Sequence, residues 1–207
     1  MSDPRLQGLY AVTDARLTGE PLFEAVRAAL AGGTRIVQYR DKSAEAQRRR
    51  HDATRLAGLC RDYQALFLIN DDVALAQEID ADGVHLGRTD TTVSDARRQL
   101  GHNKLIGLSC NNRLEQALTA QQAGADYVAF GRFFPSSTKP DAPQADPALL
   151  EQARQQLDLP IAAIGGITPD NAPRLREAGA DMLAVVNALF GQADIEAAAR
   201  RLSRCFD

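Results

Sequence analysis

The chain has 207 residues, of which 44% are hydrophobic and 25% are charged, with a formal net charge of −3 and a pI of about 5.7. This length suits one domain with a substantial buried core. The slightly acidic balance argues against nucleic acid or an anionic membrane as a partner, because either needs a concentrated basic surface. One basic run, Arg48–Arg50, lies in a helical segment, and we interpret it as a solvated face.

The cysteines and the N-terminal residues indicate the cellular compartment of the protein. Cys60, Cys110 and Cys205 are odd in number and far apart, which fits neither a disulfide framework nor a zinc site. The first residues lack the charged and then apolar pattern of a signal peptide, and no apolar run approaches the roughly 18 residues of a membrane span. We therefore expect a soluble, cytoplasmic protein.

Short apolar runs rich in β-branched residues alternate with longer segments that have apolar residues at helical spacing, such as SAEAQRRRHDATRLAGLC and RLEQALTAQQ. The short runs predict strands. In chain order, these are GLYAVTD from Gly8, RIVQYRD from Arg35, ALFLIND from Ala65, GVHLG from Gly83, LIGLSC from Leu105, DYVAFGRF from Asp126, PIAAIGG from Pro160 and DMLAVVN from Asp181.

A glycine recurs where a predicted helix leads into a predicted strand, in AGGTRIV, DADGVHL, AGADYVA and AGADMLA. Glycine can adopt the left-handed conformation that closes a helix, after which the chain enters the next strand directly. The four phrases are typical of one repeated βα unit.

Continuous apolar strands, each followed by a helix, predict an α/β protein with a parallel sheet covered on its outside. Eight such units in about 200 residues favour a single (β/α)8 TIM barrel domain over residues 1–207. The alternative is a doubly wound open sheet. That fold usually has fewer units, and the sequence has no Gly-x-Gly-x-x-Gly after its first strand.

Active sites of such barrels lie at the carboxyl ends of the strands. Polar residues gather at these ends and not at the strand starts, and this asymmetry is the main evidence from the residues for an enzyme. The set comprises Thr13, Asp14, Gln38, Arg40, Lys42, Asn70, Asp71, Asp72, Arg88, Asp90, Ser109, Ser136–Lys139, Gly165, Gly166 and Asn187.

The residue types at this end favour phosphate chemistry. Arg40, Lys42 and Lys139 can bind phosphate oxygens. Asp71 and Asp90 follow neighbouring strands and can supply the carboxylates of a Mg²⁺ shell that phosphates and water complete. For each residue alone, a surface salt bridge or a helix cap is the alternative, and their gathering at one end favours the site.

A second anion site is predicted at IGGITPDN. Two glycines end the predicted strand, and Thr168 can cap a helix with Pro169 at its first position. Backbone N–H groups there resemble the phosphate seat that many barrels have after strands seven and eight. The alternative is a tight turn that needs glycine. The loop GRFFPSSTKPDAP would lie between the two phosphate sites.

Nucleophilic catalysis has no candidate, because no Cys–His or Ser–His–Asp arrangement is readable. His85 is the one histidine in a predicted strand. We expect it to be buried and hydrogen-bonded in a structural role.

With these residues in view, the chain resembles the thiamine-phosphate synthase (thiamine-phosphate pyrophosphorylase) family. Eight motifs occur in order over nearly the whole length: GLYAVTD, VQYRDK, LIND, GVHLGRTD, IGLSC, GRFFPSSTKP, AIGGIT and AVVNALF. The resemblance implies a (β/α)8 barrel that joins a hydroxymethylpyrimidine diphosphate to a thiazole phosphate, or to its carboxylated form. The products would be thiamine phosphate and pyrophosphate, by a dissociative reaction that requires Mg²⁺.

The resemblance also implies site residues. Catalytic roles would fall to Arg40, Lys42, Ser109 and Lys139. The pyrimidine diphosphate would contact Gln38, Tyr39, Arg40, Asp41, Lys42, Asn70, Ser109 and Lys139. The thiazole phosphate would contact Ser136, Ser137, Thr138, Gly166, Val186 and Asn187. Asp71 and Asp90 would hold Mg²⁺.

The sequence departs from the family pattern at Arg88, where Gln is frequent, at Asn187, where Ser is frequent, and at Asn111 and Asn112, near which a His is common. Two rival functions stay open: a thiazole tautomerase on the same barrel, and a non-catalytic protein that binds thiamine precursors. The expected partners are two phosphorylated small molecules, without nucleic acid or membrane, and exposed helices would permit a homodimer.

Overall fold

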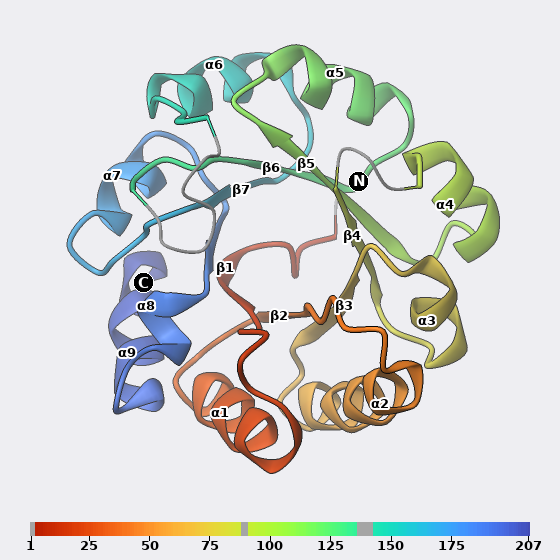
Figure 1. Cartoon of the computed structure of the whole chain (residues 1–207). Coiled ribbons are helices and arrows are strands. Elements are labelled where there is room, and N and C mark those ends of the chain that lie inside the picture. The colour runs from red at the N-terminus through yellow and green to blue at the C-terminus, as the bar shows by residue number, and fades with distance from the viewer. Residues whose placement is uncertain (1–2, 88–90, 136–142) are drawn as a thin grey trace.

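The computed structural model describes residues 3–87, 91–135 and 143–207. Eight parallel strands pair in chain order, and the eighth pairs with the first, so that the sheet closes into a barrel inside a ring of helices (Figure 1). The strands are β1 (Gly8–Val12), β2 (Ile36–Tyr39), β3 (Leu66–Asn70), β4 (Gly83–Leu86), β5 (Leu105–Asn111), β6 (Tyr127–Phe130), β7 (Ile161–Ile164) and β8 (Met182–Val185). All eight predicted strands and the (β/α)8 barrel are confirmed.

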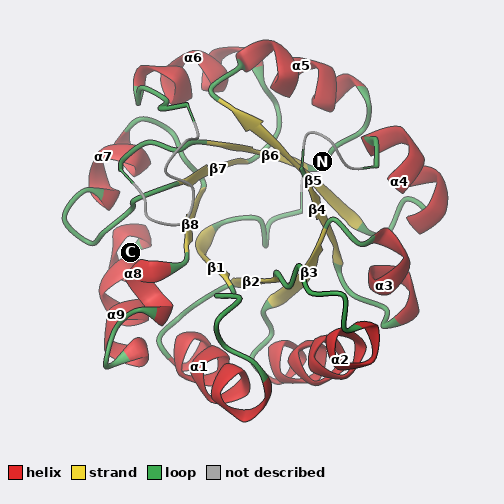
Figure 2. Cartoon of the chain, viewed as in Figure 1, coloured by secondary structure: helices red, strands yellow, loops and turns green. Residues whose placement is uncertain are grey.

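The helices cover the outside of the barrel (Figure 2). They are α1 (Gly19–Ala31), α2 (Ala46–Asp62), α3 (Val73–Glu78), α4 (Val93–Leu100), α5 (Leu114–Gln122), α6 (Ala148–Gln156), α7 (Ala172–Glu177), α8 (Asn187–Phe190) and α9 (Ile195–Ser203). One more helix is described than the eight units predict, because the short α8 precedes α9 after β8. None of the described helices has the length and apolar character needed to cross a membrane.

The strands are mostly apolar because both of their faces are buried. In β1, Leu9 and Ala11 pack in the cluster between the barrel and the helices, whereas Tyr10 and Val12 pack in the cluster inside the barrel. This alternation follows from the two-residue repeat of a strand. Leu6, which precedes β1, joins the inner cluster, so apolar side chains fill the amino end of the barrel.

Three of the four recurring glycines close helices as predicted. Gly33, Gly124 and Gly179 have φ angles of 101°, 88° and 111°. The prediction is wrong for DADGVHL, where Asp80 has the positive φ of 54° and Gly83 begins β4. A Cβ on Gly83 would lie 2.0 Å from the carbonyl oxygen of Leu105, so close strand packing requires glycine there.

The interpretation of Arg48–Arg50 as a solvated face is wrong for two of the three residues. The side chains of Arg48 and Arg49 are 27% and 22% exposed, and Arg49 pairs with Asp72 at 2.6 Å. Arg50 is 64% exposed and pairs with Glu78. Acidic residues of the loop after β2 and of α3 cover this face of α2, and the helical pattern alone does not reveal them.

The prediction that Thr168 caps a helix is also wrong. Residues 168–171 form a turn, and α7 begins at Ala172 after Asn171. The turn is closed by the Asn171 side chain, whose Oδ1 accepts a hydrogen bond from the backbone N–H of Thr168 at 2.9 Å. The amide of Asn171 also donates to the carbonyl oxygen of Gly166 at 3.1 Å.

Candidate active site

A cavity of about 330 Å³ opens at the carboxyl end of the barrel, and the ends of all eight strands contribute to its lining. Of the predicted site residues, those that line it together are Gln38, Arg40, Asn70, Ser109, Gly165, Gly166, Val186 and Asn187. Arg88, Asp90 and Ser136–Lys139 lie outside the described residues. The cavity therefore brings together residues that the sequence spreads over 150 positions (38 to 187).

Arg40 is the predicted cation in this lining, which also includes Arg132. Its backbone N–H donates to the hydroxyl of the buried Thr13 at 2.9 Å, which fixes the loop after β2 to the end of β1. Among the residues that the structure describes, its guanidinium has no carboxylate partner. A cation in a cavity without a counter-ion is suited to bind an anionic ligand.

Tyr39 and Asp41 do not line the cavity, unlike their neighbours Gln38 and Arg40. Tyr39 is 4% exposed and packs in the outer cluster, because successive strand residues point to opposite faces. Its hydroxyl donates to Asp41 at 3.1 Å. The structure thus gives no contact with the cavity for two residues that the resemblance assigns to the pyrimidine diphosphate.

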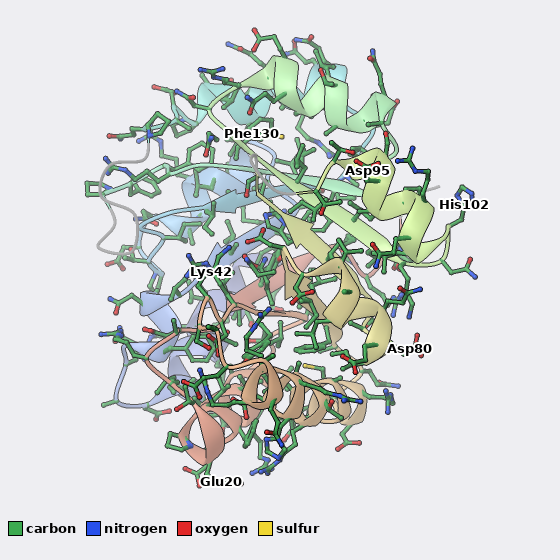
Figure 3. The ribbon with its side chains drawn as sticks, turned by 45° about the vertical axis from the view of Figure 1, so that its right-hand side comes forward. Glu20, Lys42, Asp80, Asp95, His102 and Phe130 are labelled. Carbon is green, nitrogen blue, oxygen red and sulfur yellow. The ribbon has the colours of Figure 1, made fainter. Side chains whose placement is uncertain are left out.

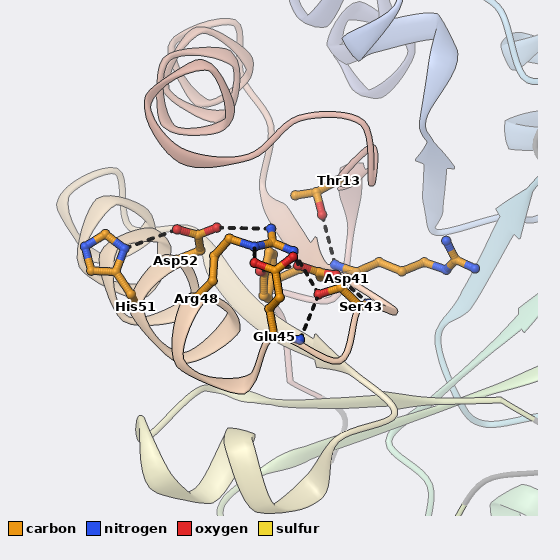
Figure 4. Close-up of polar contacts among 9 residues, drawn as sticks. Thr13, Asp41, Ser43, Glu45, Arg48, His51 and Asp52 are labelled. Atoms are coloured by element: carbon orange, nitrogen blue, oxygen red, sulfur yellow. Dashed lines mark hydrogen bonds and ion pairs between the residues drawn. The ribbon is translucent and has the colours of Figure 1, made fainter.

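Instead, Asp41 belongs to a network that supports the loop after β2 (Figure 4). It accepts a hydrogen bond from the backbone N–H of Ser43 at 2.8 Å and pairs with Arg48 at 3.0 Å. Burial alone would raise the pKa of Asp41, but these hydrogen bonds and the charge of Arg48 lower it below its ordinary value. Arg48 also lies 3.9 Å from the buried Asp52.

Lys42 and Asp71 lie beside the cavity and form an ion pair. Figure 3 shows Lys42 over the barrel, whereas Asp80 and His102 lie at the outer edge of the molecule. The other carboxylate oxygen of Asp71 accepts from the backbone N–H of Gly87 at 3.0 Å. Asp71 has a φ of 63°, a conformation that is unfavourable for a non-glycine residue and that often marks functional sites.

The metal prediction can be tested in part. The described residues hold no group of three or more His, Cys, Asp and Glu side chains suited to a metal ion. Asp71 is the described member of the predicted pair. One or two carboxylates fit Mg²⁺, which usually takes its remaining oxygens from phosphate groups and water. Two other acidic residues at this end have structural roles, since Asp14 pairs with Arg16 and Asp72 caps α3.

The second anion site predicted from the sequence falls in the region after β7 and β8. Gly165 and Gly166 have positive φ angles of 104° and 64°, and both line the cavity. Asn187 begins α8, and the first N–H groups of a helix have no carbonyl partner within that helix. The two strand ends therefore present glycine backbone and helix N–H groups to the same cavity.

Inside the barrel, below the loops, lies a continuous hydrogen-bonded set that we call the floor network: Gln38, Tyr10, Tyr127, His85 and Ser109. The amide of Gln38 donates to Tyr10 at 2.5 Å, and the hydroxyls of Tyr10 and Tyr127 are 2.8 Å apart. Nδ1 of His85 lies 2.8 Å from the Tyr127 hydroxyl, and its Nε2 lies 2.8 Å from the Ser109 hydroxyl. The expectation that His85 is buried and hydrogen-bonded is confirmed, but it also lines the cavity.

Sequence reasoning missed Tyr10 and Tyr127. Both lie inside apolar strands, where an aromatic residue ordinarily signals core packing. The available signal was the alternation of side chains along a strand. It places Tyr10 on the same face as Val12, and it places Gln38 on the same face as Ile36. Arg132 and Gln192 also line the cavity and were not predicted.

Comparison with known proteins agrees with this geometry. The family described as "Thiamine monophosphate synthase" matches residues 9–189. The chain is 55% identical over 206 residues to the thiamine-phosphate synthase of Alcanivorax borkumensis, covering 98% of this chain and 95% of the relative. It is 53% identical over 195 residues to that of Nitrosococcus oceani, covering 94% and 90%.

Among solved structures, the thiamine phosphate pyrophosphorylase of Pyrococcus furiosus superposes with a TM-score of 0.89 at 37% identity, covering 98% of this chain and 97% of that one. Identity at this level over nearly full length extends the match from the fold to the family. The chain belongs to the thiamine monophosphate synthase family.

Proposed function

We propose that the chain is a transferase that makes thiamine phosphate. It joins 4-amino-2-methyl-5-(diphosphooxymethyl)pyrimidine to 4-methyl-5-(2-phosphooxyethyl)thiazole and releases pyrophosphate. Family membership supports the reaction. The structural observation that carries it is Arg40, a guanidinium without a described carboxylate partner in a cavity that Gly166, Val186 and Asn187 also line.

The diphosphate would bind beside Arg40 and Lys42. Arg40 can grip two phosphate oxygens at once. Lys42 is paired with Asp71 and would exchange this carboxylate for the diphosphate. Asn70 and Ser109 would contact the pyrimidine part, because both line the cavity below these cations. Lys139 stays a predicted diphosphate contact.

The thiazole phosphate would bind at the ends of β7 and β8, against Gly166, Val186 and Asn187. Gly166 lets backbone approach an anion closely, and the start of α8 offers N–H donors. Ser136, Ser137 and Thr138 stay predicted contacts of the same phosphate. The carboxylated thiazole stays an alternative substrate form.

Mg²⁺ is the proposed cofactor, with Asp71 and Asp90 as its protein ligands. Bound there, the ion would neutralise charge that grows on the departing pyrophosphate. The chain's own cations, Arg40 and Lys42, would act on the same charge from fixed positions, and such preorganised groups are worth more where water is excluded.

The reaction needs no general base. The bond that forms joins the thiazole nitrogen to the pyrimidine methylene carbon, and this nitrogen bears no proton to lose. The bond that breaks is between that carbon and the diphosphate oxygen, whose electron pair leaves with pyrophosphate. The task of the protein is therefore to align the two rings and to keep water away from the electron-poor methylene carbon.

The test is product formation by the purified chain with both substrates, with and without Mg²⁺. Arg40→Ala is expected to lower kcat/KM on the order of 10²–10³-fold, because one preorganised charged contact is lost. Arg27→Ala, at an exposed position on α1, is the matched control. Tight binding of both substrates without product would contradict the transferase and favour a binding protein. A cytoplasmic location and a homodimer stay predictions.

A further inference from the structure

The floor network has a defined hydrogen-bond direction. The Gln38 amide nitrogen can only donate, so the Tyr10 hydroxyl accepts from it. Tyr10 then uses its own hydrogen toward Tyr127, and Tyr127 donates to Nδ1 of His85. This leaves the hydrogen of the histidine on Nε2, which donates to Ser109.

The opposite direction is less favourable. If Nδ1 of His85 donated to Tyr127, then Tyr127 would donate to Tyr10, and Tyr10 would accept twice. The Tyr10 hydroxyl hydrogen, on a side chain 1% exposed, would then have no acceptor among the described residues. An unmade bond of a buried hydroxyl is costly. Burial also raises the pKa of Tyr10 and Tyr127, which keeps both hydroxyls protonated as donors.

Packing holds the network in place. The Tyr10 and Tyr127 rings make an edge contact with centroids 6.2 Å apart, and the His85 ring lies 5.5 Å from that of Tyr127. The Tyr127 ring covers Gly107 so closely that a Cβ there would lie 2.1 Å from Cζ. The rings therefore have little freedom to change partners, and the direction of the network is fixed by the fold.

The two ends of the network face the cavity with opposite polarity. Gln38 directs its amide nitrogen to Tyr10, and its carbonyl oxygen has no hydrogen bond among the described residues. Ser109 accepts from His85, which leaves its hydroxyl hydrogen available to a ligand. The cavity floor thus offers an acceptor on the β2 side and a donor on the β5 side.

We propose that Tyr10, Tyr127 and His85 are positioning residues that fix the polarity of Gln38 and Ser109, and thereby select an amino-substituted over an oxo-substituted heteroaromatic ring. This rests on the proposed function, in which one substrate is an aminopyrimidine. An amino group is a donor for Gln38, and a ring nitrogen is an acceptor for Ser109. An oxo group would place a second acceptor against the Gln38 oxygen, and a mismatched polar pair is strongly rejected.

The experiment compares binding of the aminopyrimidine diphosphate and its oxo analogue by calorimetry. The variants are Tyr127→Phe and Tyr10→Phe, and the control is Tyr63→Phe, at a residue that is 42% exposed. We expect the wild-type chain and the control to prefer the amino ligand on the order of 100-fold or more, and each inner variant to lose about tenfold or more of that preference. The dissociation constant of inorganic pyrophosphate should not change, since its contacts lie outside the network.

Two further readouts separate this role from a folding role and from the proposed function. KM for the thiazole phosphate should stay unchanged in the variants that fold. If Tyr127→Phe does not fold, the comparison is made with Tyr10→Phe. Equal binding of both rings by the wild-type chain, or an unchanged preference in both variants, would overturn the inference. A preference that falls in the variants while the wild-type chain makes no thiamine phosphate would overturn the proposed function and leave the inference standing.

Discussion

Arg48 should contribute much more to stability than its neighbour Arg50, although both are paired arginines of α2. Arg48 lies 3.0 Å from Asp41 and 3.9 Å from Asp52, whose side chains are 10% and 2% exposed. Its Nε also donates to Glu45 at 2.9 Å (Figure 4). Arg48→Met would leave two largely buried carboxylates without their cation.

The expected loss is about 2–4 kcal/mol of unfolding free energy, somewhat below the roughly 3–5 kcal/mol of a fully buried broken pair. For a domain of this size, this corresponds to a fall in Tm of roughly 5–15 °C. The matched control is Arg50→Met, which removes the ion pair with Glu78. The side chains of Arg50 and Glu78 are 64% and 45% exposed. An exposed pair is worth about 0–1 kcal/mol, so the control should change little.

Urea unfolding of both variants measures the difference, and kinetics measure its consequence for the site. Because Asp41 and Thr13 hold the loop that presents Arg40, the Arg48 variant should raise KM for the pyrimidine diphosphate more than for the thiazole phosphate. Equal and small losses of stability in the two variants would refute the view that Arg48 supports this loop.

Four further outcomes are expected. Thr13→Val removes the acceptor of the Arg40 backbone N–H and should cost about 1–3 kcal/mol in urea unfolding; an unchanged midpoint would count against that bond. Gly107→Ala places a Cβ 2.1 Å from the Tyr127 ring and should cost about 3 kcal/mol or more, seen as a lower Tm by circular dichroism. The pKa of Asp41 is lowered from 3.8, so its stabilising effect is complete above that pH and is lost as the pH falls through the lower folded value. The gap in stability between the wild-type chain and Asp41→Asn should therefore shrink between about pH 5 and about pH 3, and a gap that widens would contradict the sign. Chelation of Mg²⁺ should abolish thiamine phosphate formation while circular dichroism stays unchanged, since the described residues hold no cluster of three or more His, Cys, Asp and Glu side chains that could make a structural metal site.

The loop after β2 shows where motif reading loses precision. The resemblance assigned the contiguous residues Gln38 through Lys42 to one ligand, although the reading of the strand ends had singled out Gln38, Arg40 and Lys42. In the structure Gln38 and Arg40 line the cavity, whereas Tyr39 and Asp41 face α2. Strand geometry could have divided the phrase, because successive side chains of a strand point to opposite faces.

The helix start after β7 shows a second limit. Thr168 and Pro169 form a plausible cap and first helical residue, but Asn171 closes a turn over this segment and α7 begins later. The side chain of Asn competes with a helix for backbone hydrogen bonds, and local sequence does not decide that competition.

The sequence by itself determined the eight strands, the barrel and most of the residues at its open end. Burial on both faces makes the strands mostly apolar, and the glycine exits repeat with the βα unit, so these signals are local. The tertiary structure alone decided which polar residues meet. The hydroxyls of Tyr10 and Tyr127 are 117 positions apart in sequence and 2.8 Å apart in space. Closure of the barrel brings these two hydroxyls together, and the alternation of side chains within a single strand does not predict that contact.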